Sequence, residues 1–296
     1  MNAAPKLSVV VAVQQAQANL MDVAAALEPG AHPDVEFIFC HAAATPGTGR
    51  DGTGEVNAAE IYGGPDALIP HLWRDGIRAA KGTWVATTTA HCIPASDWVA
   101  RLKGHVDDPA AAIGGVLAND AAAGSLAWAI YLLRYTAFAA PQPMGAVSEV
   151  AADNAMYRRS LLLEPPDLLA DGFWEPTFHA RLRAAGHEIR LDPALIVTHR
   201  NCYRAGGFFG QRLAHGRQFG HARAATWSRV RLLAMLLAAP LLPLAFLRKI
   251  VRAARRHPVC SPHVLPALGW LLVFVSAWGM GEAMGYWTAL QRGNAK

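Results

Sequence analysis

Charged residues and cysteines are both scarce in this chain of 296 residues. Charged residues make up 17% of the sequence and hydrophobic residues 53%, whereas roughly a quarter of a typical soluble protein is charged. We therefore expect part of the chain to contact lipid. The four cysteines are scattered and include no C-x-x-C pair, which argues against a zinc motif and a dense disulfide framework. Scattered free thiols are typical of a reducing compartment.

The chain also lacks a secretory signal pattern and a strong overall charge. One Lys precedes the first apolar run, and no small-residue cleavage site follows it, so we do not expect a signal peptide. The formal net charge is +5, and a basic cluster lies late in the chain, at Arg248, Lys249, Arg252, Arg255 and Arg256. Because this cluster adjoins long apolar runs, it indicates anionic lipid headgroups rather than nucleic acid as a partner.

Short apolar runs alternate with helical stretches over the first 100 residues or so. The strand-like runs are residues 7–13, 35–40 and 83–89, and the helical stretches are 19–28 and 68–82. This alternation predicts an α/β fold with a mostly parallel sheet. Ligands of such sheets bind at the carboxyl ends of the strands, here near Gln14, His41 and residues 89–94. Residues 41–64, rich in Gly, Ala and Thr, are expected to form a long loop at this edge.

The character of the sequence changes after residue 200. Residues 201–230 mix aromatic and basic residues, as an amphipathic interfacial segment does. Residues 232–247 are uncharged but contain Pro240 and Pro243, and their length is marginal for a membrane span, whereas residues 264–290 are long enough. A crossing by the first run would oppose the positive-inside tendency. We therefore predict a re-entrant or interfacial 232–247 and a transmembrane 264–290, with soluble core helices as the alternative.

Four stretches of the first 200 residues form an ordered set. They are KLSVVVAVQQAQANL, LWRDGIRAAKGTWVATTTAHCIPASDWV, AADNAMYRRSLL and FWEPTFHARLRAAGHEIRLDPALIVTHR. Together, over residues 6 to 200, they resemble the family 2 glycosyltransferases, the GT-A fold enzymes that move a sugar from a nucleotide donor with inversion. The resemblance implies a mostly parallel sheet with helices on both faces in residues 1–200, followed by the interfacial segment 201–230 and membrane-associated helices in 231–296.

The resemblance also implies roles for several residues. Glu175 falls at the general-base position, where a carboxylate accepts the proton of the attacking sugar hydroxyl, and Asp171 is the reserve candidate. Asp153, Asn154 and Trp174 fall on the acceptor side. Two plainer readings stay open: Glu175 could only complement a helix dipole, and Asp153 with Asn154 could only form a turn before a helix.

Two positions depart from the family's pattern. The family holds a divalent cation with D-x-D, but residues 88–91 here read Thr-Thr-Ala-His, which is a poor magnesium site. The imidazole of His91 accepts manganese better, and when protonated it neutralises phosphate itself, so we expect either Mn²⁺ or no metal. A plain hydrogen bond within the loop is the alternative for His91. The second departure is Cys40-His41, where the family has a base-reading Asp.

Thr89, His91 and Arg74 are accordingly the candidate contacts to the donor and its diphosphate. The implied function is transfer of a sugar from a nucleotide-sugar donor to a lipid-linked or polysaccharide acceptor, in membrane polysaccharide biosynthesis. The implied location is the cell inner membrane, with the main domain facing the cytoplasm. The alternative is a catalytically inactive relative that serves as a binding or assembly partner in a polysaccharide complex. The missing acidic residues favour this alternative, and the retained Glu175 favours the enzyme.

Overall fold

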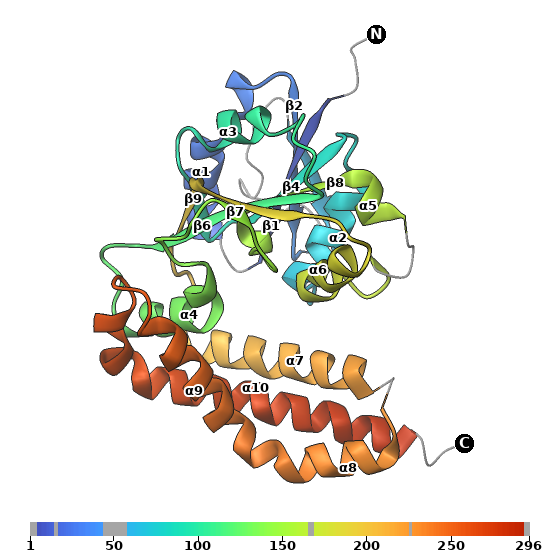
Figure 1. The fold of residues 1–296 in the computed structure, drawn as a ribbon, viewed down its shortest axis with the longest axis vertical. Helices are drawn as coiled ribbons and strands as arrows, with labels where there is room; N and C mark the ends of the chain where they lie inside the picture. Colours follow the sequence, from blue (N-terminus) through green and yellow to red (C-terminus); the bar gives the residue numbers. More distant parts are fainter. Residues whose placement is uncertain (1–4, 15–16, 44–57, 165–168, 225–226, 293–296) are drawn as a thin grey trace. The chain divides into compact units, whose positions relative to one another are not determined.

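The computed structural model describes residues 5–14, 17–43, 58–164, 169–224 and 227–292. The chain divides into two compact units (Figure 1). Unit 1 comprises residues 1–121 and 138–202, and unit 2 comprises residues 122–137 and 203–296. Residues 122–137, which lie inside the sequence range predicted for the first domain, thus group with the C-terminal residues. The predicted boundaries at residues 200 and 230 remain predictions.

Unit 1 is built on a mixed sheet whose first half is parallel. Strands β1 (Leu7–Val13), β2 (Val35–His41), β3 (Ala58–Tyr62) and β4 (Trp84–Thr89) lie in the order β3-β2-β1-β4 and run parallel. Every residue of β1 is buried, as expected of a parallel strand that is covered on both faces. The β-branched runs of the sequence therefore form the parallel strands that they predict.

The second half of the sheet contains both orientations. Strand β8 (Ala155–Arg158) runs antiparallel to its two neighbours, β4 and β6 (Ala112–Asn119). Strand β9 (Ile189–His199) runs parallel to β6. The short strands β5 (Cys92–Pro94) and β7 (Gly145–Ala146) pair antiparallel with β9. Strand β8 therefore enters the sheet from the opposite direction, and its first residues meet the last residues of β4.

Strand β3 lies inside the segment that the sequence predicts to be a loop. It pairs in parallel with β2, and His41 aligns with Tyr62. The loop prediction for residues 41–64 is therefore wrong at residues 58–62, while residues 44–57 lie outside the described part of the chain. A single short run, AAEIY, carries too little alternation to be distinguished from its Gly-rich and Ala-rich surroundings.

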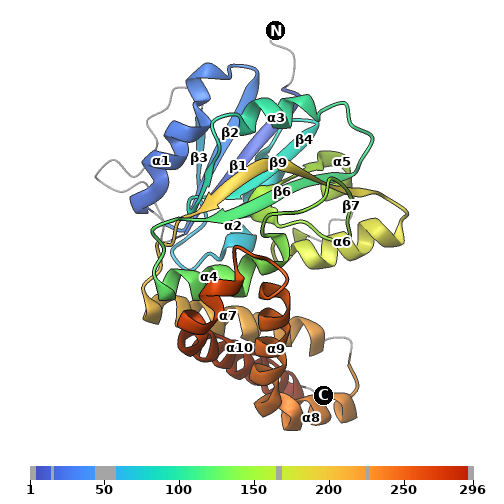
Figure 2. The same cartoon turned by 60° about the vertical axis from the view of Figure 1, so that its left-hand side comes forward.

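Helices cover both faces of the sheet (Figure 1, Figure 2). Helices α1 (Gln17–Leu27) and α3 (Trp98–Gly104) contact β5 and β9, respectively. Helices α2 (Ile69–Ala79), α5 (Arg159–Leu163) and α6 (Glu175–Ala184) share one hydrophobic cluster with the even-numbered side chains of β1. This layered arrangement is the α/β architecture predicted from the sequence.

Helix α2 packs unusually close to the sheet at Gly76. A β-carbon at this position would lie 2.3 Å from Val10 Cγ1 and 2.9 Å from Cys40 Sγ. Contacts this short force neighbouring atoms to move, so only glycine fits between α2 and the strands.

We predict that Gly76→Ala lowers the free energy of unfolding by about 1–3 kcal/mol through overpacking. Gly104→Ala is the matched control, because a β-carbon at Gly104, at the end of α3, meets no atom within 4 Å. Thermal melts of the purified full chain would measure both. Equal melting temperatures for the two variants would contradict the close approach.

His179 of α6 is buried in the aromatic core of unit 1. Its Nε2 lies 3.2 Å from the hydroxyl of Tyr157, and the two rings stack with centroids 5.8 Å apart. Burial lowers the pKa of His179 to about 4, and the cation of Arg183 lowers it further in the same direction. The neutral form of His179 is therefore the one that the fold accommodates.

Acid should consequently destabilise unit 1 through His179. His179 binds a proton with a pKa near 6.5 in the unfolded chain and only near 4 in the folded chain. The stability that the neutral His179 contributes is therefore complete above pH 6.5 and is lost as the pH falls toward 4. Native protein should lose about 3 kcal/mol more than His179→Gln over this window. His187→Gln, at an exposed position between α6 and β9, should retain the native pH dependence. Identical pH profiles for native protein and His179→Gln would contradict the assignment.

Unit 2 consists of helices in its described part. Helix α4 (Ser125–Tyr135) comes from the middle of the sequence, and the others are α7 (Ala205–Ala224), α8 (Arg229–Ala238), α9 (Leu242–Ala254) and α10 (Val264–Arg292). Helix α10 contacts all four other helices. Its most extensive contact is with α7, which belongs to the segment predicted to be interfacial.

Glycines on both helices bring α7 and α10 into backbone contact. A β-carbon at Gly216 or Gly220 of α7 would lie 2.3 or 2.4 Å from a carbonyl oxygen of α10. A β-carbon at Gly281 or Gly285 of α10 would lie 2.1 or 2.4 Å from a carbonyl oxygen of α7. Pairs of small residues at this four-residue spacing are typical of helices that associate in membranes.

Two helical segments of unit 2 are long and apolar enough to cross a membrane. They are Arg229–Ala254, which contains α8 and α9, and Ser261–Gln291, which contains all but the last residue of α10. Large apolar side chains on both segments are exposed, among them Leu237 and Leu265. The re-entrant course predicted for residues 232–247 and the crossing predicted for residues 264–290 remain predictions.

Candidate active site

The carboxyl ends of the parallel strands meet at one edge of unit 1, as the sequence predicts. Val13 at the end of β1 aligns with His41 of β2, and Ala12 aligns with Thr89 of β4. Gln14, just past β1, donates a hydrogen bond from Nε2 to the carbonyl oxygen of Ala67 at 2.9 Å. The three segments expected to meet a ligand therefore adjoin one another in the structure.

A buried polar cluster lies at the end of β4. Thr89 Oγ1 donates to Asp153 Oδ1 at 3.0 Å and lies 3.2 Å from His91 Nε2. His91 Nε2 is 3.4 Å from Asp153 Oδ1, and Cys92 Sγ is 3.9 Å from the same oxygen. Residues 87–92 contain no carboxylate, so Asp153 provides the acidic group of this cluster.

Asp153 reaches this position because of the pairing between β4 and β8. It belongs to a short 3₁₀ turn, Ala152–Asn154, that leads into β8. The antiparallel register aligns Thr87 with Ala155, and Thr87 Oγ1 donates to the carbonyl oxygen of Ala152 at 2.6 Å. The start of β8 therefore lies beside the end of β4, although the two are more than sixty residues apart in sequence.

Asn154 supports this turn from inside the core. Its side-chain oxygen accepts a hydrogen bond from Trp98 Nε1 at 2.7 Å. Its Nδ2 donates to the carbonyl oxygens of Val116 and Leu195 at 2.9 and 3.0 Å. Both amide hydrogens are thus used within the protein, so the side chain holds the turn in place, and its predicted contact to an acceptor remains a prediction.

His199 is a second imidazole at this cluster, and the sequence analysis missed it. It is the last residue of β9, where it aligns with Cys92 of β5. Its ring meets that of His91 edge to face, with centroids 5.6 Å apart, and its Nδ1 lies 3.2 Å from Asn119 Oδ1. The signal that could have identified it is a histidine directly at the end of a predicted strand.

The ligand atoms of His91, Cys92 and Asp153 fit a divalent cation of intermediate softness. One atom from each residue lies within 4.8 Å of the other two, and all three residues are buried. An imidazole with a carboxylate suits Mn²⁺, and the sulfur of Cys92 additionally favours softer ions. The set is poor for Mg²⁺, which prefers oxygen ligands and retains several waters.

Glu175 is the first residue of α6 and is partly exposed. Its position at the helix N-terminus stabilises the ionised carboxylate. The pKa of Tyr157 is raised well above its usual value, first by burial and then by the negative charges of Glu175 and Asp153. Both carboxylates therefore act in the same direction on the pKa of this buried phenol.

The loop before α6 is held against the start of α2. Phe173 donates its backbone N–H to the carbonyl oxygen of Pro70 at 2.8 Å. Gly172 has a φ of 110° and packs against His71, a conformation that L side chains rarely adopt. Trp174 Nε1 donates to the carbonyl oxygen of Asp171 at 3.1 Å, and the carboxylate of Asp171 is exposed. These contacts fix where Glu175 begins its helix.

Arg74 lies at a separate hollow and is already paired. Its Nε and Nη2 donate to the two carboxylate oxygens of Asp75 at 2.7 and 3.1 Å. The hollow has a volume of about 340 Å³ and is also lined by His71 and Asp66. Burial lowers the pKa of His71, and the charge of Arg74 adds to this effect. Arg74 would have to exchange Asp75 for a phosphate to serve the predicted donor role.

A further acidic group, missed in the sequence, lies at the end of β2. His41 Nε2 contacts the carboxylate of Glu60 on β3, and its ring stacks on Tyr62 with centroids 5.0 Å apart. His41 occupies the position where the resemblance implies a base-reading Asp. Glu60 could not be identified from the sequence because the strand that carries it was predicted to be loop.

The central part of the chain, which includes the polar cluster, matches a known protein family. Residues 73–164 match the profile of the family described as Glycosyl transferase family 2. The matched segment runs from α2 to the end of α5 and includes Thr89, His91 and Asp153. No curated protein matches the chain.

The chain is also similar to solved glycosyltransferases, at low sequence identity. Mannosyltransferase PcManGT from Pyrobaculum calidifontis, in complex with GDP-Man and Mn²⁺, is 17% identical with a TM-score of 0.48, over 99% of this chain and 88% of that chain. S. aureus TarS 1–349 in complex with UDP-GlcNAc is 12% identical with a TM-score of 0.49, over 96% and 91%. The family profile confirms, over residues 73–164, the resemblance to the family 2 glycosyltransferases that is seen in the sequence.

Proposed function

We propose that the chain transfers a sugar, with inversion, from a nucleotide-sugar donor to a lipid-linked or polysaccharide acceptor presented at a membrane. The observation that carries this proposal is the buried cluster of Thr89, His91 and Asp153 at the carboxyl end of β4, within the segment that matches the glycosyltransferase profile. In this proposal Glu175 accepts a proton and the cluster meets a phosphate. The apolar helices of unit 2 support attachment to a membrane, and we propose that this is the inner membrane, with the main domain facing the cytoplasm.

In the proposed reaction, Glu175 accepts the proton of the acceptor hydroxyl as that oxygen attacks the anomeric carbon. The new carbon–oxygen bond forms on the face of the anomeric carbon opposite the diphosphate. The bond from that carbon to the diphosphate oxygen breaks at the same time, and the diphosphate leaves with the electron pair. Inversion follows from this single displacement. The acid Glu175 then returns its proton to solvent, so the site regenerates itself.

The departing diphosphate carries negative charge that the site must stabilise. A protonated His91 donates a charge-assisted hydrogen bond to it, and Thr89 adds a hydroxyl. A bound Mn²⁺ would supply electrophilic stabilisation of the phosphate oxygens, with His91 and Asp153 as its protein ligands. In the metal-free case the carboxylate of Asp153, 3.4 Å from His91 Nε2, is the counter-charge for a protonated imidazole.

The alternative function, a binding or assembly partner without turnover, is favoured by the burial of the cluster. The exposed fractions of His91, Cys92 and Asp153 are 1%, 0% and 5%. Calorimetry with nucleotide sugars combined with a product assay separates the two functions. Donor binding without hydrolysis or transfer to any lipid acceptor would support the binding partner.

Glu175→Gln should leave donor affinity unchanged and lower kcat by about two to four orders of magnitude, because the amide cannot accept the proton. The matched control is Glu164→Gln, at an exposed position of the same unit, which should retain native turnover. Asp171→Asn tests the reserve candidate. Native turnover in Glu175→Gln with loss of turnover in Asp171→Asn would assign the general base to Asp171. Native turnover in both variants would show that neither residue is the general base.

Calorimetry with Mn²⁺ and Mg²⁺ tests the role of the cluster. We expect Mn²⁺ to bind more tightly than Mg²⁺, and His91→Ala and Asp153→Asn each to weaken Mn²⁺ or donor-diphosphate binding by about tenfold to a hundredfold. His187→Ala, an exposed imidazole, is the matched control. Magnesium-dependent activity that is unaffected by His91→Ala and Asp153→Asn would show that the ligands lie elsewhere.

A further inference from the structure

The charges of the chain are divided very unequally between the two units. Unit 2 contains 14 Lys and Arg residues but only one acidic residue, Glu282. Glu282 is fully buried and accepts hydrogen bonds from Arg223 Nη1 at 2.9 Å and Trp278 Nε1 at 3.2 Å. The only carboxylate side chain of unit 2 is therefore already occupied, and none remains to neutralise the other cations of this unit.

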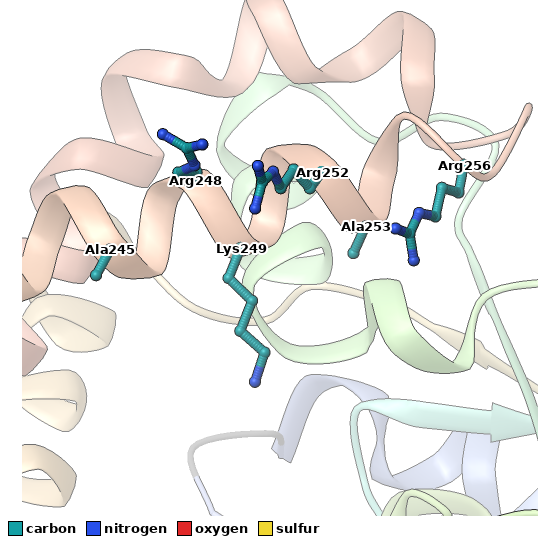
Figure 3. Close-up of a pocket in the computed structure, with 6 residues that line it drawn as sticks. All are labelled: Ala245, Arg248, Lys249, Arg252, Ala253 and Arg256. Carbon is teal, nitrogen blue, oxygen red and sulfur yellow. The ribbon is translucent and has the colours of Figure 1, made fainter.

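The cations of α9 gather around one hollow. Arg248, Lys249, Arg252 and Arg256, with Ala245 and Ala253 between them, line an open space of about 470 Å³. Figure 3 shows these four cationic side chains projecting from successive turns of α9 and from its C-terminal end. All four are exposed, and no ion pair joins any of them to a carboxylate among the described residues. Like charges held this close repel one another unless an anion lies between them.

An apolar stripe leads directly to this hollow. Large side chains on the segment Arg229–Ala254 are exposed at a spacing of three or four residues, namely Val230, Leu233, Leu237, Leu241 and Leu244. Residues three and four apart lie on the same face of a helix, so within α9 Arg248 and Arg252 lie on the face of Leu244, while Val230, Leu233 and Leu237 belong to the preceding helix α8. A face that passes from leucine to arginine matches the passage from acyl chains to headgroups.

We propose that α9 binds the phosphate groups of anionic phospholipids at the hollow formed by Arg248, Lys249, Arg252 and Arg256, with the leucine stripe in contact with the acyl chains. The cations provide the attraction for the phosphate, and the stripe explains why the phosphate belongs to a lipid rather than to a soluble ligand or a nucleic acid. The proposal does not rest on sugar transfer, because all of these residues belong to unit 2 and all candidate active-site residues belong to unit 1.

Displacement of a fluorescent phosphatidylglycerol from the detergent-purified full chain tests the proposal. For native protein, phosphatidylglycerol should compete at least about tenfold better than phosphatidylcholine. The preference should weaken as salt shortens the screening length from about 10 Å at 0.1 M to about 3 Å at 1 M. Equal competition by the two lipids would overturn the proposal.

Variants then locate the site. The fourfold variant Arg248→Gln, Lys249→Gln, Arg252→Gln and Arg256→Gln should lose the preference, whereas replacement of the three arginines by Lys should retain it. The matched control, Lys6→Gln, Lys81→Gln, Arg101→Gln and Arg181→Gln in unit 1, removes the same charge and should behave as native. A preference that survives the first variant, or is lost equally in the control, would show that α9 is not the site.

Soluble competitors distinguish the source of the phosphate. Inorganic phosphate and a short RNA should displace the fluorescent lipid far less well than phosphatidylglycerol, because neither contacts the leucine stripe. Displacement by either at the same concentration as the lipid would replace this proposal with a soluble-anion site. Sugar transfer is assayed separately on the same preparations, so native protein that transfers sugar but shows no preference for phosphatidylglycerol contradicts only the lipid site.

Discussion

The antiparallel pairing of β8 with β4 is the constraint on which the candidate active site depends. It places the turn that carries Asp153 beside the end of β4, where His91 and Thr89 emerge. Burying an ionised carboxylate is costly unless partners surround it, and here a hydroxyl, an imidazole and a thiol do so. Asn154 then fixes the same turn to three separate parts of the core, so the cluster is held by the sheet rather than by its own loop.

The candidate base is positioned by a different set of contacts. Helix α2 approaches the sheet closely at Gly76, and its first turn receives the loop that precedes α6 through the hydrogen bond between Phe173 and Pro70. The location of Glu175 therefore depends on how α2 packs against β1 and β2. Tyr157 of β8 stacks on His179 of α6, which links α6 to the β4–β8 pairing.

Unit 2 is held together by close backbone packing between helices. Backbone contact at Gly216, Gly220, Gly281 and Gly285 joins α7 to α10 without large side chains between them, and Glu282 ties Arg223, Trp278 and Tyr286 to the same interface. Its remaining cations have no acidic side chain within the unit to pair with. Unit 2 is therefore a positively charged helical unit with exposed leucines. The sheet unit, in contrast, contains nearly all the acidic residues of the chain.

The sequence by itself determined three of the four parallel strands (β1, β2 and β4), the edge where ligands collect, the helix that begins at Glu175, and the apolar helices near the C-terminus. Each of these is encoded by a local period or by a short run of residues, which is why they could be predicted. Only the tertiary structure decided that Asp153 completes the cluster at His91, that His199 and Glu60 join the same edge, and that α4 packs with the C-terminal helices. These depend on pairings between distant residues, as between Thr87 and Ala155, and local pattern carries no information about which distant strand will supply a partner.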